Sequence, residues 1–235
     1  QLGTDDDGAI ADYSEAIRLS PDGTDYKNRA QVYLVKQDFD QAIADCTEAI
    51  RLDPKDYEAY ARRGEAYLAD KQHRMALIDC SQAINLKKDY PLPYRTRAIT
   101  YLDQGNGQVE QAAKDLSQAI ALDHPWLLDC FRDREPVFEA LGDEKHAAYD
   151  KQVIKLFEAG ETSDRNPDKV AELAWHLATF PAETVRCGPR AVRLATEAAE
   201  RGEFQNPAQW DVLAAARAEN GGFDHGARRQ QQTIS

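Results

Sequence analysis

The stretch LDPKDYEAYARRGEAYLAD, Leu52 to Asp70, predicts an amphipathic helix with a glycine at its centre. Tyr60 and Tyr67 lie on the same side of that helix as Gly64. Alanine at this position would favour the helix by about 0.8 to 1 kcal/mol, because glycine loses more backbone freedom on folding. The glycine therefore needs a packing reason, and the rest of the sequence supplies one.

The same residue types recur along the chain at intervals of 34 residues. Three sets of equivalent positions are Tyr26, Tyr60 and Tyr94; Ala30, Gly64 and Ala98; and Tyr33, Tyr67 and Tyr101. Further downstream, equivalent pairs are Ala42 and Ala76, Cys46 and Cys80, and Ala49 and Ala83. The third copy runs two residues late, after a polar, glycine-containing insertion at 105–108. A fixed period of this length indicates a repeat architecture.

Each copy contains two helical segments separated by a polar turn, such as 57–69 and 74–86 in the middle copy. Each unit is therefore predicted to be a helical hairpin. Gly64 falls where the first helix faces the second, opposite Ala76, and Ala30 and Ala98 fall at the same place in their copies. Small residues there let the two backbones approach closely. That packing outweighs the lost helix propensity, because a helix in a protein draws most of its stability from its packed face.

The pattern resembles the tetratricopeptide repeat, whose 34-residue signature has an aromatic, a small and a second aromatic residue, then A-x-x-x-F and a closing proline. The middle copy matches it at Tyr60, Gly64, Tyr67, Ala76 and Ala83, with Pro21 and Pro54 closing the two copies before it. Arginines at 29, 63 and 97 replace the usual leucine, and Cys46 and Cys80 replace the usual aromatic residue. The resemblance implies an all-α fold, a right-handed superhelix of antiparallel helix hairpins.

The positions of the repeats divide the chain into three regions. Residues 1–125 are predicted to be the repeat array, a partial repeat followed by three repeats, and the register starts before Gln1. Residues 126–163 are predicted to be a degenerate repeat, in which Pro136 should kink or shorten the first helix. Residues 164–235 are predicted to be a helical module of similar kind, resembling one found after such repeats in large bacterial proteins. The chain is expected to be part of a longer protein.

Charge and composition limit the classes of partner. The net charge is −12, with 15 basic and 22 acidic residues before Pro125 and 14 and 19 from there on. An evenly acidic surface argues against nucleic acid and against anionic membranes, since both bind basic faces. No run approaches the length of a membrane span, and we expect no membrane insertion. A cytoplasmic location is favoured.

No catalytic or metal-binding pattern stands out in the sequence. The chain has no H-E-x-x-H, G-x-S-x-G, P-loop or G-x-G-x-x-G motif, and its five histidines are scattered. The four cysteines are far apart, without zinc-ligand spacing, and are expected to be buried and reduced. We therefore expect no catalytic residues, no metal and no cofactor.

The resemblance to tetratricopeptide arrays also implies a binding surface, because the first helices of such arrays line a concave groove. The residues that the resemblance places in that groove are Lys27, Asn28, Gln31, Arg62, Glu65, Arg95, Thr96 and Ile99. Three of them, Lys27, Arg62 and Arg95, form a basic line that would favour an acidic or carboxylate-ended peptide. The alternative is that these long side chains pair with their neighbours. The match to the carboxylate-clamp subclass of the family is partial, since Gln31, Glu65 and Leu92 depart from its pattern.

Two functions remain in view at this point. The first is a non-catalytic scaffold that binds a peptide or protein partner in the groove, because repeat arrays present extended surfaces. The second is the regulatory or docking region of an enzyme whose catalytic domain lies upstream of Gln1. The sequence favours the first.

Overall fold

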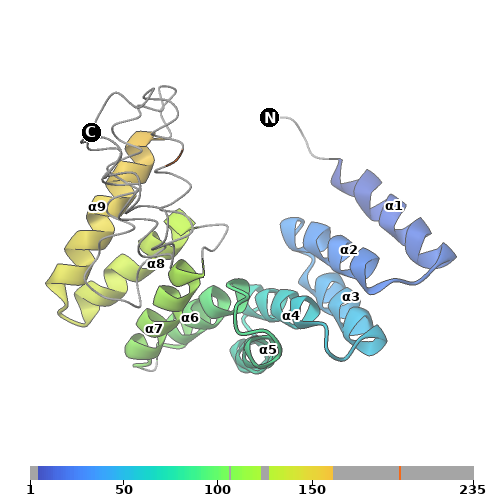
Figure 1. Cartoon of the computed structure of the whole chain (residues 1–235). Coiled ribbons are helices and arrows are strands. Elements are labelled where there is room, and N and C mark those ends of the chain that lie inside the picture. The colour runs from blue at the N-terminus through green and yellow to red at the C-terminus, as the bar shows by residue number, and fades with distance from the viewer. Residues whose placement is uncertain (1–4, 106, 123–126, 161–195, 197–235) are drawn as a thin grey trace, which may run out of the picture. The chain divides into compact units, whose positions relative to one another are not determined.

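The computed structural model describes residues 5–105, 107–122, 127–160 and 196. This part of the chain is all-α (Figure 1). Its helices are α1 (Asp6–Leu19), α2 (Gly23–Val35), α3 (Phe39–Leu52), α4 (Tyr57–Ala69), α5 (His73–Leu86), α6 (Leu92–Gln104), α7 (Val109–Ala121), α8 (Leu127–Ala140) and α9 (Glu144–Gly160). The chain packs as two compact units, Gln1–Asp115 and Leu116–Ser235.

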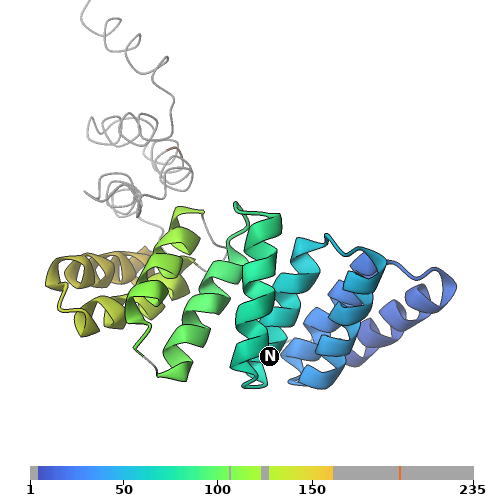
Figure 2. The same cartoon turned by 90° about the horizontal axis from the view of Figure 1, so that it is seen from below.

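The predicted hairpins are confirmed. The closest helix pairs are α2 with α3, α4 with α5, and α8 with α9. In the first unit, α3 packs on α4 and α5 on α6, so that successive hairpins lie side by side (Figure 2). The first helices also contact one another, because α4 packs against both α2 and α6. These three helices therefore form a continuous row.

Aspartate caps and left-handed turns set the helix boundaries. Asp5, Asp22, Asp38 and Asp56 each accept a hydrogen bond from a backbone N–H in the first turn of the helix that follows. Between the helices of the hairpins, a residue with positive φ recurs at Gln37, Lys71, Gly105 and Gly142. Glycine adopts a positive φ at the lowest cost, yet in the first two hairpins the residues with this conformation are Gln37 and Lys71.

The contact between the two helices of a hairpin explains Gly64. A Cβ atom added there would lie 2.8 Å from Cys80 Sγ and 3.5 Å from the carbonyl oxygen of Ala76. Ala30 occupies the equivalent place in the preceding hairpin, where it packs with Ala42 and Cys46 in a fully buried cluster. The expectation of small residues at this interface is confirmed.

An ion pair between an arginine and a buried aspartate recurs in each of the described hairpins. An arginine of the first helix donates two hydrogen bonds, of 2.6 to 3.0 Å, to an aspartate of the second. The pairs are Arg29 with Asp45, Arg63 with Asp79, Arg97 with Asp115, and Arg134 with Asp150. Arg29, Arg63 and Arg97 stand in the position that leucine usually has in the repeat. Their aspartate partners were not predicted from the sequence.

Two further contacts hold each arginine. Aromatic rings flank the guanidinium groups, for example Tyr60 and Tyr67 at 5.6 and 5.8 Å from Arg63 Cζ. The remaining nitrogen, Nη1, donates to a hydroxyl of the preceding second helix, and these hydroxyls belong to Ser14, Thr47, Ser81 and Ser117. Each arginine thus links two neighbouring repeats as well as the two helices of its own hairpin.

Pro136 lies inside α8 and does not shorten it. The helix runs for 14 residues and continues past the proline to Ala140, so of the two effects expected there, a kink or a shortening, the shortening does not occur. Pro136 and Arg132 are both exposed, so that water can satisfy the carbonyl of Arg132 that loses its usual donor. On the other face, Phe131, Arg134 and Phe138 are buried and hold the helix in place.

We expect Cys46 and Cys80 to resist alkylation in the folded chain. Both are fully buried free thiols, as the sequence analysis expected. Burial raises the pKa of Cys46 to about 12 and that of Cys80 further still, so the reactive thiolate is scarce at pH 8. Iodoacetamide treatment followed by site-resolved mass spectrometry should label both only after unfolding in urea. Rapid labelling of the native chain would contradict this packing.

Several sequence-based expectations lie outside the described residues. They are the polar boundary at 160–168 beyond Gly160, the module at 164–235, Cys187, and the histidines at 124, 176 and 225. Within the described part, no helix combines the length and apolar character needed to cross a membrane. The same residues contain no group of three or more side chains suited to hold a metal ion.

Candidate peptide-binding surface

The eight residues expected to line the groove lie on α2, α4 and α6, the row of first helices. Seven of them are half-buried, and Thr96 is buried. The Thr96 hydroxyl donates a hydrogen bond of 3.2 Å to the carbonyl of Leu92, one turn earlier, so its donor is already used. Asn28 and Ile99 add an amide and an apolar side chain to the surface.

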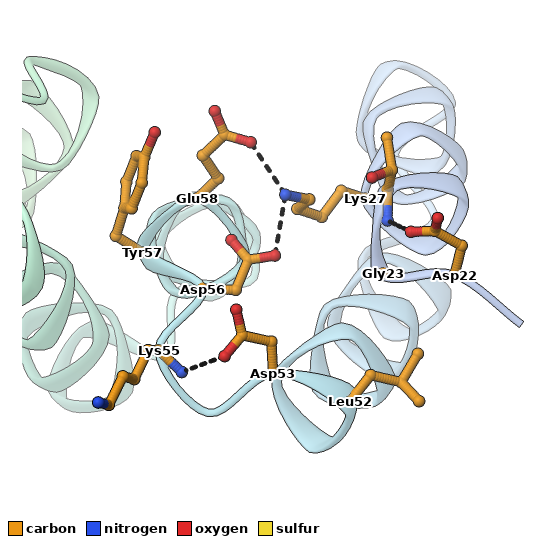
Figure 3. Close-up of a pocket in the computed structure, with 10 residues that line it drawn as sticks. Asp22, Gly23, Lys27, Leu52, Asp53, Lys55, Asp56, Tyr57 and Glu58 are labelled. Carbon is orange, nitrogen blue, oxygen red and sulfur yellow. Dashed lines mark hydrogen bonds and ion pairs between the residues drawn. The ribbon is translucent and has the colours of Figure 1, made fainter.

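Lys27 is held by two carboxylates of the next repeat (Figure 3). Its Nζ lies 2.8 Å from Asp56 Oδ2 and 2.9 Å from Glu58 Oε2, and its side chain is 13% exposed. Burial lowers the pKa of Lys27, but the hydrogen bonds to Asp56 and Glu58 outweigh it, and the pKa rises above the usual value. The alternative interpretation of the basic line, pairing with neighbours, therefore holds for this lysine.

A shallow pocket opens beside this ion pair (Figure 3). It has a volume of about 420 Å³ and lies between the start of α2 and the turn that leads into α4. Four carboxylates and two lysines line it, together with Gly23, Thr24, Leu52 and Tyr57; the charged residues are Asp22, Asp53, Asp56, Glu58, Lys27 and Lys55. The excess of carboxylates makes this end of the row unsuitable for an acidic ligand.

Arg62 has an unused hydrogen-bond donor. Its Nη1 donates to Gln31 Oε1 on the preceding first helix, which joins α2 to α4. Its Nε is buried and has no hydrogen-bond partner among the described residues. A buried donor left without an acceptor is costly, so a change of rotamer that brings this nitrogen to a ligand oxygen would be favourable.

Glu65 lies one turn further along α4, within the electrostatic reach of two of the cations. Burial raises the pKa of Glu65, while Arg62 and Arg95 act in the opposite direction. Glu65 thus neutralises part of the positive charge at the centre of the row. Three cations, Lys27, Arg62 and Arg95, stand against three carboxylates, Asp56, Glu58 and Glu65. The basic line is therefore balanced in formal charge.

Four residues of this surface were missed by the sequence analysis. Asp56 and Glu58 hold Lys27, and Tyr57 and Tyr90 stack edge to face with centroids 5.0 Å apart. Burial raises the pKa of Tyr90, and Arg62 opposes that shift, which places the tyrosine near the central arginine. Asp56 could have been suspected, because it repeats Asp22 after one period.

The two described histidines lie outside the row of first helices. His146 Nδ1 is paired with Asp143 Oδ2 at 2.6 Å, and His73 Nδ1 is buried without a hydrogen-bond partner in the described part of the chain. The row itself offers groups suited to recognition, which are charge-assisted hydrogen bonds, an amide and aromatic rings.

Comparison with known proteins agrees with the repeat pattern. Two tetratricopeptide repeat family models match residues 25–56 and 46–78. No curated sequence matches the chain significantly. Similar solved structures include the crystal structure of MamA, with 21% identity over 62% of this chain and 84% of that chain, and a TM-score of 0.53.

Two further structures are similar. MamA 41-end from Desulfovibrio magneticus RS-1 is 19% identical over 67% of this chain and 88% of that chain, with a TM-score of 0.56. The APC/C hetero-tetramer Cut9–Hcn1 is 14% identical over 92% of this chain and 40% of that chain, with a TM-score of 0.57. At such identities the likeness concerns the fold alone.

Consecutive helical hairpins, small residues between their helices and a row of first helices define the described part of the chain as an all-α helical repeat. The family matches narrow this class for part of the chain: residues 25–78 match the tetratricopeptide repeat, and the described helices share the fold of the similar structures. Proteins of this family are scaffolds for protein interaction, and the fold is typically non-catalytic.

Proposed function

We propose that the chain is a non-catalytic scaffold that binds an extended peptide across α2, α4 and α6. An acidic or carboxylate-ended segment is the favoured ligand, with its carboxylate at Arg62 and Arg95 rather than at Lys27. The buried Nε of Arg62, which has no acceptor in the described part of the chain, carries this proposal. Gln31, Asn28, Thr96 and Ile99 would flank the peptide.

The charge balance of the surface decides how the ligand would bind. Lys27 is occupied by Asp56 and Glu58, so it contributes little to an acidic ligand. Glu65 repels a ligand carboxylate, but its raised pKa means that it loses its charge more readily than an ordinary glutamate. Binding of an acidic peptide should therefore be coupled to protonation of Glu65.

A screen of acidic peptides with free C-terminal carboxylates, each paired with its C-terminal amide, should identify a ligand. With the tightest binder, Arg62→Gln should weaken binding about tenfold or more, because a charge-assisted hydrogen bond is lost. Glu65→Gln should tighten it, because the repulsive charge is removed. Arg74→Gln, at an exposed arginine of α5, is the matched control and should bind like the unmodified chain.

The pH dependence provides an independent readout. As the pH falls from 7, Glu65 is protonated before a carboxylate of ordinary pKa, so the surface loses a negative charge while the peptide keeps its own. Affinity should therefore rise across that window in the unmodified chain and stay flat in Glu65→Gln. Equal affinity for the acid and amide peptides, or no effect of Arg62→Gln, would defeat the proposal.

Lys27 should be left unchanged in these experiments. A change to glutamate would place a third carboxylate beside Asp56 and Glu58, and a loss of binding could then reflect misfolding. The neutral change at Arg62 avoids this ambiguity, because it introduces no new charge.

A further inference from the structure

The pocket beside Lys27 carries an excess of negative charge. It has a volume of about 420 Å³, and four carboxylates against two lysines give its lining a formal charge of −2. The lining residues come from the start of α2, the turn between α3 and α4, and the start of α4. The pocket thus lies between two consecutive described hairpins, and both of its walls belong to them.

Two of the four carboxylates are accessible to a ligand. Asp22 and Asp53 are exposed, whereas the other two hold Lys27 (Figure 3). Asp22 Oδ1 accepts the backbone N–H of Thr24 at 2.7 Å, and Asp53 Oδ1 accepts that of Lys55 at 2.9 Å. The hydrogen bond from the Thr24 backbone also keeps the pKa of Asp22 below its usual value. Asp22 is therefore charged at pH 7 and held in place.

Lys27 shows which kind of group this lining stabilises. Its ammonium group lies 2.8 Å from Asp56 and 2.9 Å from Glu58, although only 13% of the side chain is exposed. Tyr57 adds an aromatic wall to the pocket, and its ring already has the Nζ of Lys87 at 5.5 Å from the centroid. Carboxylates beside an aromatic ring suit an ammonium or guanidinium group.

We propose, building on the function proposed above, that the partner segment is bipolar: its carboxylate end binds at Arg62 and Arg95, and a lysine or arginine a few residues earlier enters this pocket. Opposite charges on one surface support this arrangement. The buried Nε of Arg62 needs an acceptor, which it lacks in the described part of the chain, and the exposed carboxylates of the pocket need a cation.

The helix geometry gives the spacing and the direction of such a segment. Arg62 follows Glu58 by four residues, which is about 6 Å along α4. Neighbouring helices lie about 8 to 10 Å apart, so the pocket between α2 and α4 is about 10 to 12 Å from the arginines of α4 and α6. An extended chain covers this distance in about three or four residues. The segment should therefore run from α2 towards α6, with its carboxylate end at α6.

A series of short fluorescent peptides tests this arrangement by anisotropy. Each ends in a pair of glutamates with a free carboxylate, has serine and glycine elsewhere, and carries one lysine that moves along the series. Lysine about three or four positions before the last residue should bind at least about fivefold more tightly than glutamine at the same place. The double change Asp22→Asn and Asp53→Asn should remove this gain. Asparagine keeps both acceptors for the backbone N–H groups, so folding should be preserved.

Two controls separate this inference from the function on which it rests. Asp40→Asn, at an exposed carboxylate of α3 outside the pocket, should keep the gain from lysine. A second peptide series ends in an amide and has serine in place of both glutamates. It should bind more weakly, lose its preference for lysine in the double variant, and be unaffected by Arg62→Gln.

The bipolar partner is overturned if lysine adds no affinity at any position, or if the double variant keeps the gain. The function proposed above survives that result as long as Arg62→Gln still weakens binding of the acidic peptides. If acidic and amide series bind equally, the carboxylate site fails, and the bipolar partner fails with it. An absence of saturable binding by the acidic, lysine-containing peptides up to about 1 mM also overturns the inference.

Discussion

Asp150→Ala should lower the free energy of unfolding by about 3 to 5 kcal/mol, the largest effect that we expect of a single substitution. Arg134 and Asp150 are both fully buried, and two hydrogen bonds of 2.9 and 2.6 Å join them. Without the aspartate, the guanidinium group would keep only Ser117 Oγ at 3.0 Å and the rings of Phe131 and Phe138. A buried charge without its counterion is far more costly than the pair itself.

Urea unfolding of the purified chain measures this loss, and hydrogen exchange of α8 and α9 localises it. Removing both charges with the double change Arg134→Met and Asp150→Leu should recover most of the stability, because well-packed apolar residues can replace a buried pair. Glu139→Ala, at an exposed residue of α8 that pairs with Lys151 of α9, should leave unfolding unchanged. A loss below about 1 kcal/mol for Asp150→Ala would mean that Arg134 reaches water.

Gly64→Leu should destabilise the chain by about 1 to 3 kcal/mol. Even a single added carbon would lie 2.8 Å from Cys80 Sγ, and the second helix backbone at Ala76 and Cys80 follows at 3.5 Å. A leucine side chain therefore has to push α4 away from α5. The same urea unfolding measurement tests this, and an unchanged midpoint would show that the hairpin has spare volume at this contact.

The control at the same position is Gly64→Ala. Ala30 faces Cys46 in the preceding hairpin, so a Cβ atom beside a cysteine is already accommodated there. A small adjustment of Cys80 should be offset by the gain in helix propensity, about 0.8 to 1 kcal/mol. We expect the free energy of unfolding of Gly64→Ala to stay within about 1 kcal/mol of that of the unmodified chain. A larger loss in Gly64→Leu then results from overpacking and not from the loss of glycine itself.

The hairpins and their interfaces could be predicted from the sequence, because they depend on periodicity and residue size. A helix shows its packed face every three or four residues, and a repeat shows the same face every 34. Gly64, Ala30 and Ala98 could thus be assigned to the helix interface without coordinates. The shortening expected at Pro136 did not occur, because this proline lies on the exposed side of a helix whose opposite face is buried.

The candidate site was predicted less well, because charge pairing depends on which side chains meet across helices. Self-comparison identifies Arg29, Arg63 and Arg97 as a series, and the same comparison would have found Asp45, Asp79 and Asp115. It could not show that each arginine reaches 16 to 18 residues along the chain to its aspartate. Similarly, the ion pairs of Lys27 with Asp56 and Glu58 form because α2 and α4 lie side by side, which the sequence does not show.

The sequence by itself determined the fold class, the repeat length and the helix pairs, which are encoded locally through spacing and side-chain volume within each repeat. The surface on which a partner is expected came from the resemblance to tetratricopeptide arrays. Only the tertiary structure decided which charges of that surface remain available. Burial raises the pKa of Glu65, the carboxylates of the next repeat occupy Lys27, and the buried Nε of Arg62 has no acceptor among the described residues. Desolvation and hydrogen-bond geometry depend on distances between helices, which a list of residues does not contain.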